Sequence, residues 1–209
     1  IRAVLDALGH DPARLTVPLI QLVALYRGGE QVRMGKRSGS FVTLEELLDE
    51  VGVDAARFFY IVRKAEQHLE FDLDLAKSQS ADNPVYYVQY AHARVCRVFG
   101  ELAERGLAWN RDRGEAALAR LVEPHEEALV AMLTRYPEVI EGAALAREPH
   151  QLAQFLREAA NAFHGYYHAH KFIVDDAELR DARLCLVAAA RQMLANGLAL
   201  LGVSAPQAM

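Results

Sequence analysis

Residues 83–104 read NPVYYVQYAHARVCRVFGELAE, and this stretch decides the fold of the chain. At about 100° per residue, a helix over residues 85–104 has one apolar face and a separate aromatic and basic stripe. We expect the apolar face to lie in the core of a helical bundle. The apolar face consists of Val88, Ala91, Val95, Phe99 and Leu102, and the stripe consists of Tyr87, Tyr90, Arg94 and Arg97.

The stripe has two interpretations. Aromatic faces stack on bases and guanidinium groups pair with phosphates, so the stripe is typical of a surface that binds a nucleic acid. Tyr and Arg side chains also commonly cover the edge of a core and extend their polar ends to water.

Helical periodicity extends through most of the chain on both sides of this stretch. Thr43 and Glu46 have the spacing of a capping box, which predicts a helix beginning near Leu44. A polar segment over residues 72–84 marks the main boundary. The remaining helices are predicted over residues 54–63, 85–104, 114–121, 124–136, 150–168 and 177–201, with helix-packing leucines and valines in the last of them. The chain is therefore expected to be mainly all-α.

The convincing strand signal lies near the beginning of the chain. Residues 17–25 and 31–34 are rich in β-branched and aromatic side chains and flank the pair Gly28-Gly29, which predicts a β-hairpin. Residues 1–9 resemble the end of an amphipathic helix, and because the first residue is Ile1 we expect this chain to be a piece of a longer protein.

Composition limits the class of protein. The net charge of −5 over 209 residues disfavours non-specific adhesion to nucleic acid through bulk charge. Cys96 and Cys185 provide neither a disulfide framework nor a cysteine-based zinc site, which fits a reducing cytoplasm. No run of 18 apolar residues is present, so no membrane span is expected.

The loop that follows the predicted hairpin places cations among small residues. Arg33, Lys36 and Arg37 lie beside glycines and serines, and such a loop can bring backbone amides and positive charge to phosphate oxygens. A solvated surface connector has the same composition.

Clusters of histidine and arginine have structural explanations. His164 and His168 are one helical turn apart, but no acid or cysteine completes a metal site near them or near His170, so we expect an aromatic packing segment and no metal. His125-Glu126 lacks the second histidine of a zinc protease helix. The last predicted helix contains Arg180, Arg183 and Arg191. These arginines could contact RNA or pair with the nearby acids Asp175, Asp176 and Asp181.

Several motifs in order resemble one family. The loop MGKRSG (34–39) followed by FVTL (41–44) resembles the KMSKS signature loop of class I aminoacyl-tRNA synthetases. The stretches that match the arginyl-tRNA synthetases are VDAARF (53–58), FDLDLA (71–76), NPVYYVQYAHAR (83–94), DARL (181–184) and the tail LLGVSAPQAM (200–209). The resemblance covers essentially the whole chain and implies the carboxyl-terminal part of such an enzyme.

The resemblance implies three regions. Residues 1–43 would be the end of the α/β catalytic domain, with a β-hairpin remnant and the signature loop. Residues 44–83 would form a helical connecting segment, and residues 84–209 would form the helical-bundle DALR anticodon-binding domain. The implied function is to bind the anticodon region of arginine tRNA. The full-length enzyme would attach arginine to that tRNA using ATP with Mg, as a cytoplasmic monomer.

The family's ATP loop carries over to six positions. They are Met34, Gly35, Lys36, Arg37, Ser38 and Gly39, of which Lys36 matches the second lysine of the signature and is the implied catalytic phosphate contact. Arg33 and Gly35 depart from the signature's first lysine and serine. The HIGH motif and the arginine site are absent, so we expect this chain alone to be inactive and to hold no cofactor.

The family's anticodon contacts carry over to the stripe and the tail. Tyr87, Arg94 and Met209 match positions that line the anticodon pocket, and Tyr90 lies on the same stripe. Two alternatives remain: a helical protein-interaction module without an RNA role, and the related domain of a cysteinyl-type synthetase.

Overall fold

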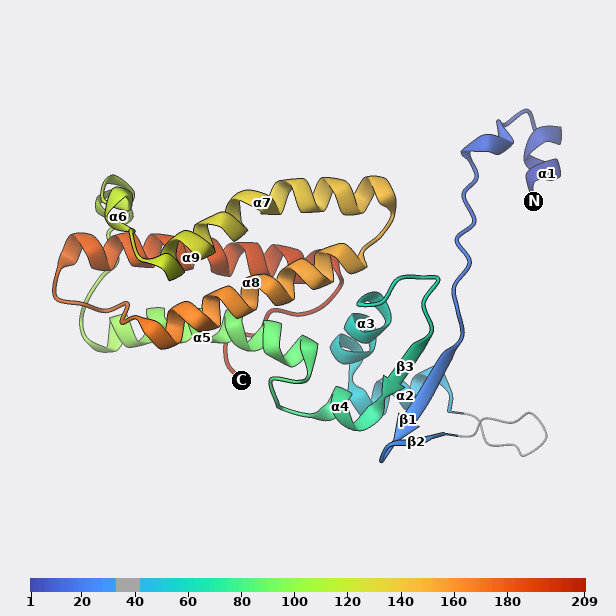
Figure 1. Ribbon diagram of the computed structural model, residues 1–209, viewed down its shortest axis with the longest axis horizontal. Coiled ribbons are helices and arrows are strands. Elements are labelled where there is room, and N and C mark those ends of the chain that lie inside the picture. The colour runs from blue at the N-terminus through green and yellow to red at the C-terminus, as the bar shows by residue number, and fades with distance from the viewer. Residues whose placement is uncertain (33–41) are drawn as a thin grey trace.

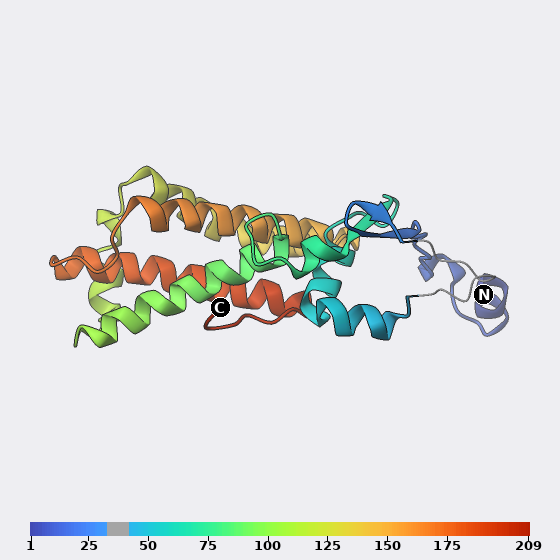
Figure 2. The ribbon, with the colours of Figure 1, turned by 90° about the horizontal axis from the view of Figure 1, so that it is seen from below.

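The structure is a computed structural model that describes residues 1–32 and 42–209, and it is elongated (Figures 1 and 2). A helical bundle occupies one end, a small sheet with short helices lies beside it, and an amino-terminal arm extends away. The bundle consists of α5 (Pro84–Glu104), α7 (Pro124–Ala146), α8 (His150–Ala169) and α9 (Ala177–Leu200), with the short α6 (Arg111–Ala116) and the 3₁₀ turn η2 (Leu118–Arg120) at its far end. The prediction of a mainly helical chain is confirmed.

The bundle core confirms the apolar face predicted for α5. Val88, Ala91 and Val95 are completely buried and Leu102 nearly so, while the Tyr and Arg stripe is turned outward. Helix α9 contributes its predicted packing residues to the same core, namely Leu184, Val187, Leu194, Leu198 and Leu201. The stripe therefore lies at the edge of the core: Arg97 is exposed, Tyr90 and Arg94 are half-buried, and Tyr87 packs partly on the core.

Helix α7 is longer than the sequence predicts. The expected end is residue 136, because the next residue is a proline, which lacks an amide hydrogen and crowds the preceding turn. The helix instead continues across Pro137 to Ala146. Beyond the proline, Ala143 is buried, and Val139 and Ile140 pack against the core. One face of this second half packs on the core, and that packing offsets the backbone hydrogen bond lost at the proline.

The predicted hairpin is present as β1 (Val23–Arg27) and β2 (Glu30–Gln31), which pair antiparallel. The turn residues Gly28 and Gly29 both have positive φ, at 59° and 79°, as a tight two-residue hairpin turn requires.

The sequence does not predict the third strand of this sheet. A third strand, β3 (Leu69–Asp72), pairs parallel with β1 to give the order β2-β1-β3. In this short strand Leu69 and Phe71 are buried while Glu70 is exposed. Four residues of alternating polarity are too few to be distinguished from a loop in the sequence.

Short helices connect the sheet to the bundle: α2 (Leu44–Val51), α3 (Val53–Ile61) and α4 (Leu73–Lys77). The capping box predicted for α2 is confirmed. Thr43 Oγ1 accepts from the Glu46 amide at 3.1 Å, and the Glu46 carboxylate accepts from the Thr43 amide at 2.7 Å. Phe59 of α3 packs on Phe71 of β3 with ring centroids 5.2 Å apart.

The junction between the connecting segment and the bundle is fixed by one buried amide. Asn83 caps α5 and donates from its side chain to the carbonyl oxygens of Ala76 and Ser78, at 3.1 and 2.8 Å. Because these carbonyls end α4, Asn83 fixes where α5 begins relative to the sheet.

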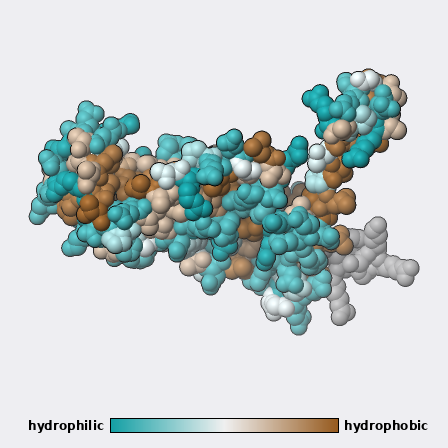
Figure 3. Space-filling view, turned by 45° about the horizontal axis from the view of Figure 1, so that its top comes forward, coloured by the Kyte–Doolittle hydropathy of each residue, from teal (hydrophilic) through white to brown (hydrophobic). Residues whose placement is uncertain are grey.

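The amino-terminal arm carries α1 (Arg2–Ala7), the 3₁₀ turn η1 (Pro12–Arg14) and an extended segment. The apolar side chains that this segment exposes are Val17, Leu19, Ile20 and Leu22. Figure 3 shows apolar surface where the arm joins the rest of the molecule. Across residues 1–32 and 42–209, no helix combines the length and apolar character needed to cross a membrane.

Candidate nucleic-acid interface

A groove of about 1050 Å³ runs along α5, between the end of α8 and the carboxyl-terminal tail. Three of the four predicted RNA contacts line it: Tyr90, Arg94 and Met209. The fourth, Tyr87, lies on the same helix but outside the groove lining. Met209 is half exposed at 51%.

Arg94 is held at the centre of this interface. Its guanidinium carbon lies 4.5 Å from the ring centroid of Tyr90 and 4.7 Å from that of Tyr167. Its Nη1 donates to His164 Nδ1 at 3.2 Å and to His168 Nε2 at 3.1 Å. Within the part of the chain that the structure describes, no carboxylate pairs with Arg94. The arginine is thus oriented by imidazole and tyrosine rings rather than by a carboxylate, and keeps its positive charge for a ligand.

His164 must be neutral to serve in this arrangement. Because Arg94 can only donate, Nδ1 of His164 accepts, and the ring hydrogen is on Nε2, which donates to the Tyr87 carbonyl at 3.2 Å. Burial lowers the pKa of His164 to about 4, and the charge of Arg94 acts in the same direction. The imidazole is therefore unprotonated at neutral pH.

Tyr87 joins α5 to α8 rather than lining the groove. Its ring centroid lies 4.5 Å from that of His164, and its hydroxyl donates to Asn161 Oδ1 at 3.2 Å. The side chain is half-buried, so part of its ring is committed to this helix contact. Tyr90, by contrast, lines the groove beside Arg94.

The tail reaches the groove because α3 and α5 anchor it. Asp54 of α3 accepts from the Ser204 amide at 3.1 Å and from the Gln89 side chain at 2.8 Å, and it also bonds the Ser204 hydroxyl. The ring of His92 contacts the Pro206 carbonyl at 2.8 Å. These contacts carry the last residues across α5 to Arg94.

The partners that orient Arg94 are missed when the sequence is read alone. His164, Tyr167 and His168 are expected there only as an aromatic packing segment, but their spacing of three and four residues places them on one face of α8 toward Arg94. This spacing is the feature of the sequence that could have indicated that the three side chains share one face of the helix. Among residues 1–32 and 42–209, no three His, Cys, Asp or Glu side chains gather as metal ligands.

The remaining arginines and acids form mostly structural pairs. Arg183 pairs with Glu126 at 2.8 Å rather than with the aspartates near it in sequence. Asp176 pairs with Arg120, and Asp181 with Arg113, each at 2.6 Å. The other two arginines of α9 make different contacts. Arg180 Nε is 3.8 Å from Asp181 Oδ1, and the guanidinium carbon of Arg191 lies 5.0 Å from the ring centroid of Phe99.

The residues predicted to contact ATP lie outside the described residues, which exclude positions 33–41. These positions include the whole ATP loop, namely Met34, Gly35, Lys36, Arg37, Ser38 and Gly39. The catalytic contact of Lys36 therefore stays a prediction.

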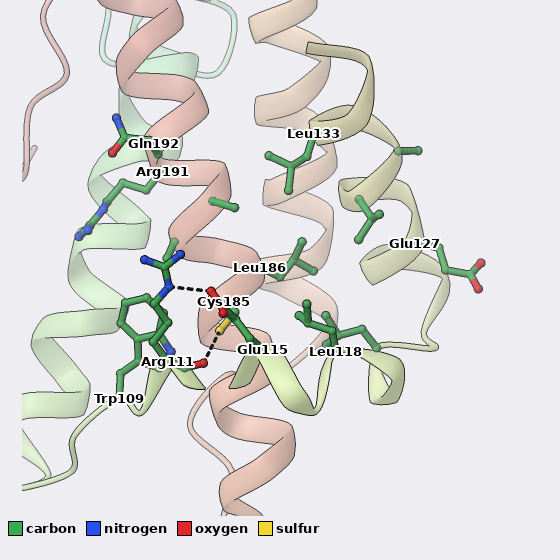
Figure 4. Close-up of a pocket in the computed structure, with 15 residues that line it drawn as sticks. Trp109, Arg111, Glu115, Leu118, Glu127, Leu133, Cys185, Leu186, Arg191 and Gln192 are labelled. Atoms are coloured by element: carbon green, nitrogen blue, oxygen red, sulfur yellow. Dashed lines mark hydrogen bonds and ion pairs between the residues drawn. The ribbon is translucent and has the colours of Figure 1, made fainter. Parts of the chain in front are cut away.

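A second hollow, of about 930 Å³, lies between α6, α7 and α9 at the far end of the bundle (Figure 4). Leu118, Leu133 and Leu186 surround it together with Trp109. Cys185 lies on its wall, where burial raises the pKa of the thiol. This hollow is mostly apolar, and although Trp109, Arg111 and Arg191 also line it, none of the four predicted RNA contacts does.

Comparison with known proteins gives matches over the whole chain. A family model described as the DALR anticodon binding domain matches residues 88–209. The chain is 63% identical to an arginine–tRNA ligase of Thioalkalivibrio sulfidiphilus and 66% identical to one of Halorhodospira halophila, each over all 209 residues. It spans 36% of the length of each of these curated relatives.

A solved structure from Campylobacter jejuni, provisionally assigned as an arginyl-tRNA synthetase, has the same fold. It superposes with a TM-score of 0.83 at 28% identity and covers 100% of this chain and 44% of its own. The matched family region contains Tyr90, Arg94, the end of α8 and the tail, and it accounts for more than half of the chain. The chain therefore belongs to the DALR anticodon-binding domain family.

Proposed function

We propose that this chain is the carboxyl-terminal part of an arginine–tRNA ligase and that its groove binds the anticodon loop of arginine tRNA. The observation that carries the proposal is the meeting of Tyr90, Arg94 and the tail in one groove. A single-stranded loop presents unstacked bases, which proteins bind with aromatic faces and planar guanidinium groups.

Each side chain has a distinct role in this proposal. Tyr90 offers a ring against which a base stacks, and Arg94 supplies charge and hydrogen-bond donors. Met209 forms an apolar wall beside the same base. Tyr87 contributes through the exposed part of its ring and by holding His164, which in turn holds Arg94.

The choice of arginine tRNA rests on the relatives. Those at 63% and 66% identity carry the arginine–tRNA ligase name, which favours this ligase over the cysteinyl alternative. By the same reasoning the longer protein would join arginine to its tRNA with ATP, through a loop that includes Lys36. Location in the cytoplasm and a monomeric state remain predictions of this proposal.

The test is a titration of the chain with arginine tRNA and with the same tRNA altered only in its anticodon. We expect weaker binding of the altered tRNA at both 50 and 200 mM salt as trial conditions, since base contacts depend less on salt than phosphate contacts. Equal binding that weakens strongly with salt would contradict the proposal. It would also favour the alternative of a helical protein-interaction module without an RNA role.

Single substitutions identify the stacking residue. Tyr90→Ala should weaken binding of arginine tRNA by about 1–3 kcal/mol, the usual contribution of one base stacked on an aromatic ring. Tyr87→Ala should cost a similar amount, part of it through the loss of contact with His164. The hydroxyl deletion Tyr90→Phe is the matched control and should bind like the parent. If Tyr90→Ala remained folded and bound as tightly as the parent, stacking on Tyr90 would be wrong.

A further inference from the structure

One buried carboxylate joins the ends of three helices. Glu126, completely buried in the first turn of α7, accepts through Oε1 from Arg183 Nε at 2.8 Å and from the Tyr166 hydroxyl at 3.0 Å. Its Oε2 accepts from the Glu123 amide at 3.0 Å. Arg183 belongs to the DARL stretch of α9, and Tyr166 lies near the end of α8.

Arg183 has a second contact with the chain that leaves α8. Its Nη1 donates to the Lys171 carbonyl at 2.8 Å, just after the helix ends at Ala169. Burial and the negative charge of Glu126 raise the pKa of Tyr166, so its hydroxyl stays protonated and keeps donating. Arg183 thus holds the end of α8 directly, and also indirectly through Glu126.

The same end of α8 carries the groups that orient Arg94. Tyr167 and His168 directly follow Tyr166 in the chain, and both contact the Arg94 guanidinium. Tyr166 and Tyr167 both pack on Phe172, with centroids 4.9 and 5.8 Å away. Neither Arg183 nor Glu126 lines the groove, and the end of α8 is the segment that connects both of them to the groups around Arg94.

We propose that Arg183 is a positioning residue for anticodon recognition: with Glu126 and Tyr166 it fixes the end of α8 so that Tyr167 and His168 orient Arg94 toward the RNA. This inference rests on the function proposed above. It gives the buried arginine of the DARL stretch a role in recognition, in addition to helix packing.

Helix α9 offers a matched control. Arg113 of α6, which is 40% exposed, forms an ion pair with the completely buried Asp181 at 2.6 Å; this pair holds α6, and within the described residues no hydrogen bond or ion pair joins it to α8. Arg183→Gln and Arg113→Gln therefore remove the same type of charge pair from opposite sides of α9. Tyr166→Phe is a gentler variant, since it removes only the hydroxyl and leaves Glu126 bound to Arg183.

The experiment measures a ratio of affinities, namely that for arginine tRNA over that for the tRNA altered in its anticodon. The variants are compared at a temperature at which unfolding curves show each to be folded. Arg183→Gln should lower the ratio by roughly three- to thirtyfold, Tyr166→Phe should lower it by less, and Arg113→Gln should leave it unchanged. An unchanged ratio in Arg183→Gln would overturn the proposal, as would an equal fall in Arg113→Gln.

A second readout separates this proposal from the proposed function. The imidazole nitrogen resonances of His164 and His168 report whether Arg94 still donates to them, and no RNA is needed for the measurement. We expect both signals to change in Arg183→Gln and not in Arg113→Gln. A parent protein that does not discriminate anticodons would contradict the function alone, whereas unchanged histidine signals in Arg183→Gln would contradict the positioning role.

Discussion

At the scale of single residues, the interface depends on an arginine held by aromatic rings and not by a carboxylate. An arginine paired with a carboxylate would have much of its charge compensated before any RNA arrived. Arg94 is instead oriented by two imidazoles and two tyrosine rings. This arrangement fixes the direction of the guanidinium while leaving its charge free to attract a phosphate or a base oxygen.

The low pKa of His164 makes stability depend on pH. The folded chain has a pKa of about 4 for this group, below the ordinary value of 6.5, so the unfolded chain binds more protons between these values. The free energy of unfolding should therefore fall as pH decreases through this window. His164→Gln keeps an acceptor and a donor but does not titrate.

Denaturant unfolding between pH 7 and pH 5, trial values chosen above the range of most carboxyl groups, checks this prediction. The parent should lose more stability than His164→Gln over this interval. Parallel pH profiles for the two proteins would show that His164 is not responsible.

At the scale of elements, the bundle depends on close approaches that the helical pattern does not reveal. Gly114 of α6 faces α9 so closely that a Cβ atom there would lie 2.4 Å from the Asp181 carbonyl oxygen. Gly142 of α7 is exposed, and the nearest atom to an added Cβ is 4.0 Å away. Both glycines lie within helices of the structure, α6 and α7.

The same substitution should have opposite effects at these two sites. Gly114→Ala should lower the free energy of unfolding by about 1–3 kcal/mol, because α6 must move away from α9. Gly142→Ala should raise it by about 0.5–1 kcal/mol, because alanine restricts the unfolded chain and favours the helix. Thermal or denaturant unfolding measures both, and a stabilised Gly114→Ala variant would contradict the close packing of α6.

At the scale of the whole molecule, the tail links the connecting segment to the interface. Asp54 of α3 bonds both Gln89 of α5 and Ser204 of the tail, so three parts distant in sequence meet at one carboxylate. The groove wall formed by residues 207–209 therefore depends on a side chain of the connecting segment.

Asp54→Ala should release the tail. The buried amide of Gln89 would lose a partner, which lowers the free energy of unfolding by about 1–3 kcal/mol. We also expect faster hydrogen exchange at the Ser204 amide and weaker binding of arginine tRNA. Asp49→Ala, at an exposed position of α2, is the control and should change none of these quantities. Unchanged exchange at Ser204 in Asp54→Ala would mean that other contacts hold the tail.

Much of the architecture could be predicted from local patterns. The apolar face of α5, the capping box at Thr43 and the Gly28-Gly29 turn each depend on residues within one or two turns of chain, so the sequence alone located them. The periodicity placed Tyr90 and Arg94 on one stripe, and the family resemblance added Met209; the groove brings these three to one surface, whereas Tyr87 lies outside its lining.

Only the tertiary structure decided which partners these residues meet. Strand β3 forms because β1 offers it an edge, and α7 continues past Pro137 because one face of the turns beyond that proline packs on the core. Arg94 is held by histidines 70 and 74 residues away in the chain. Local periodicity fixes the face of a helix on which a side chain lies. The groups opposite that face depend on how distant segments pack, which no short pattern records.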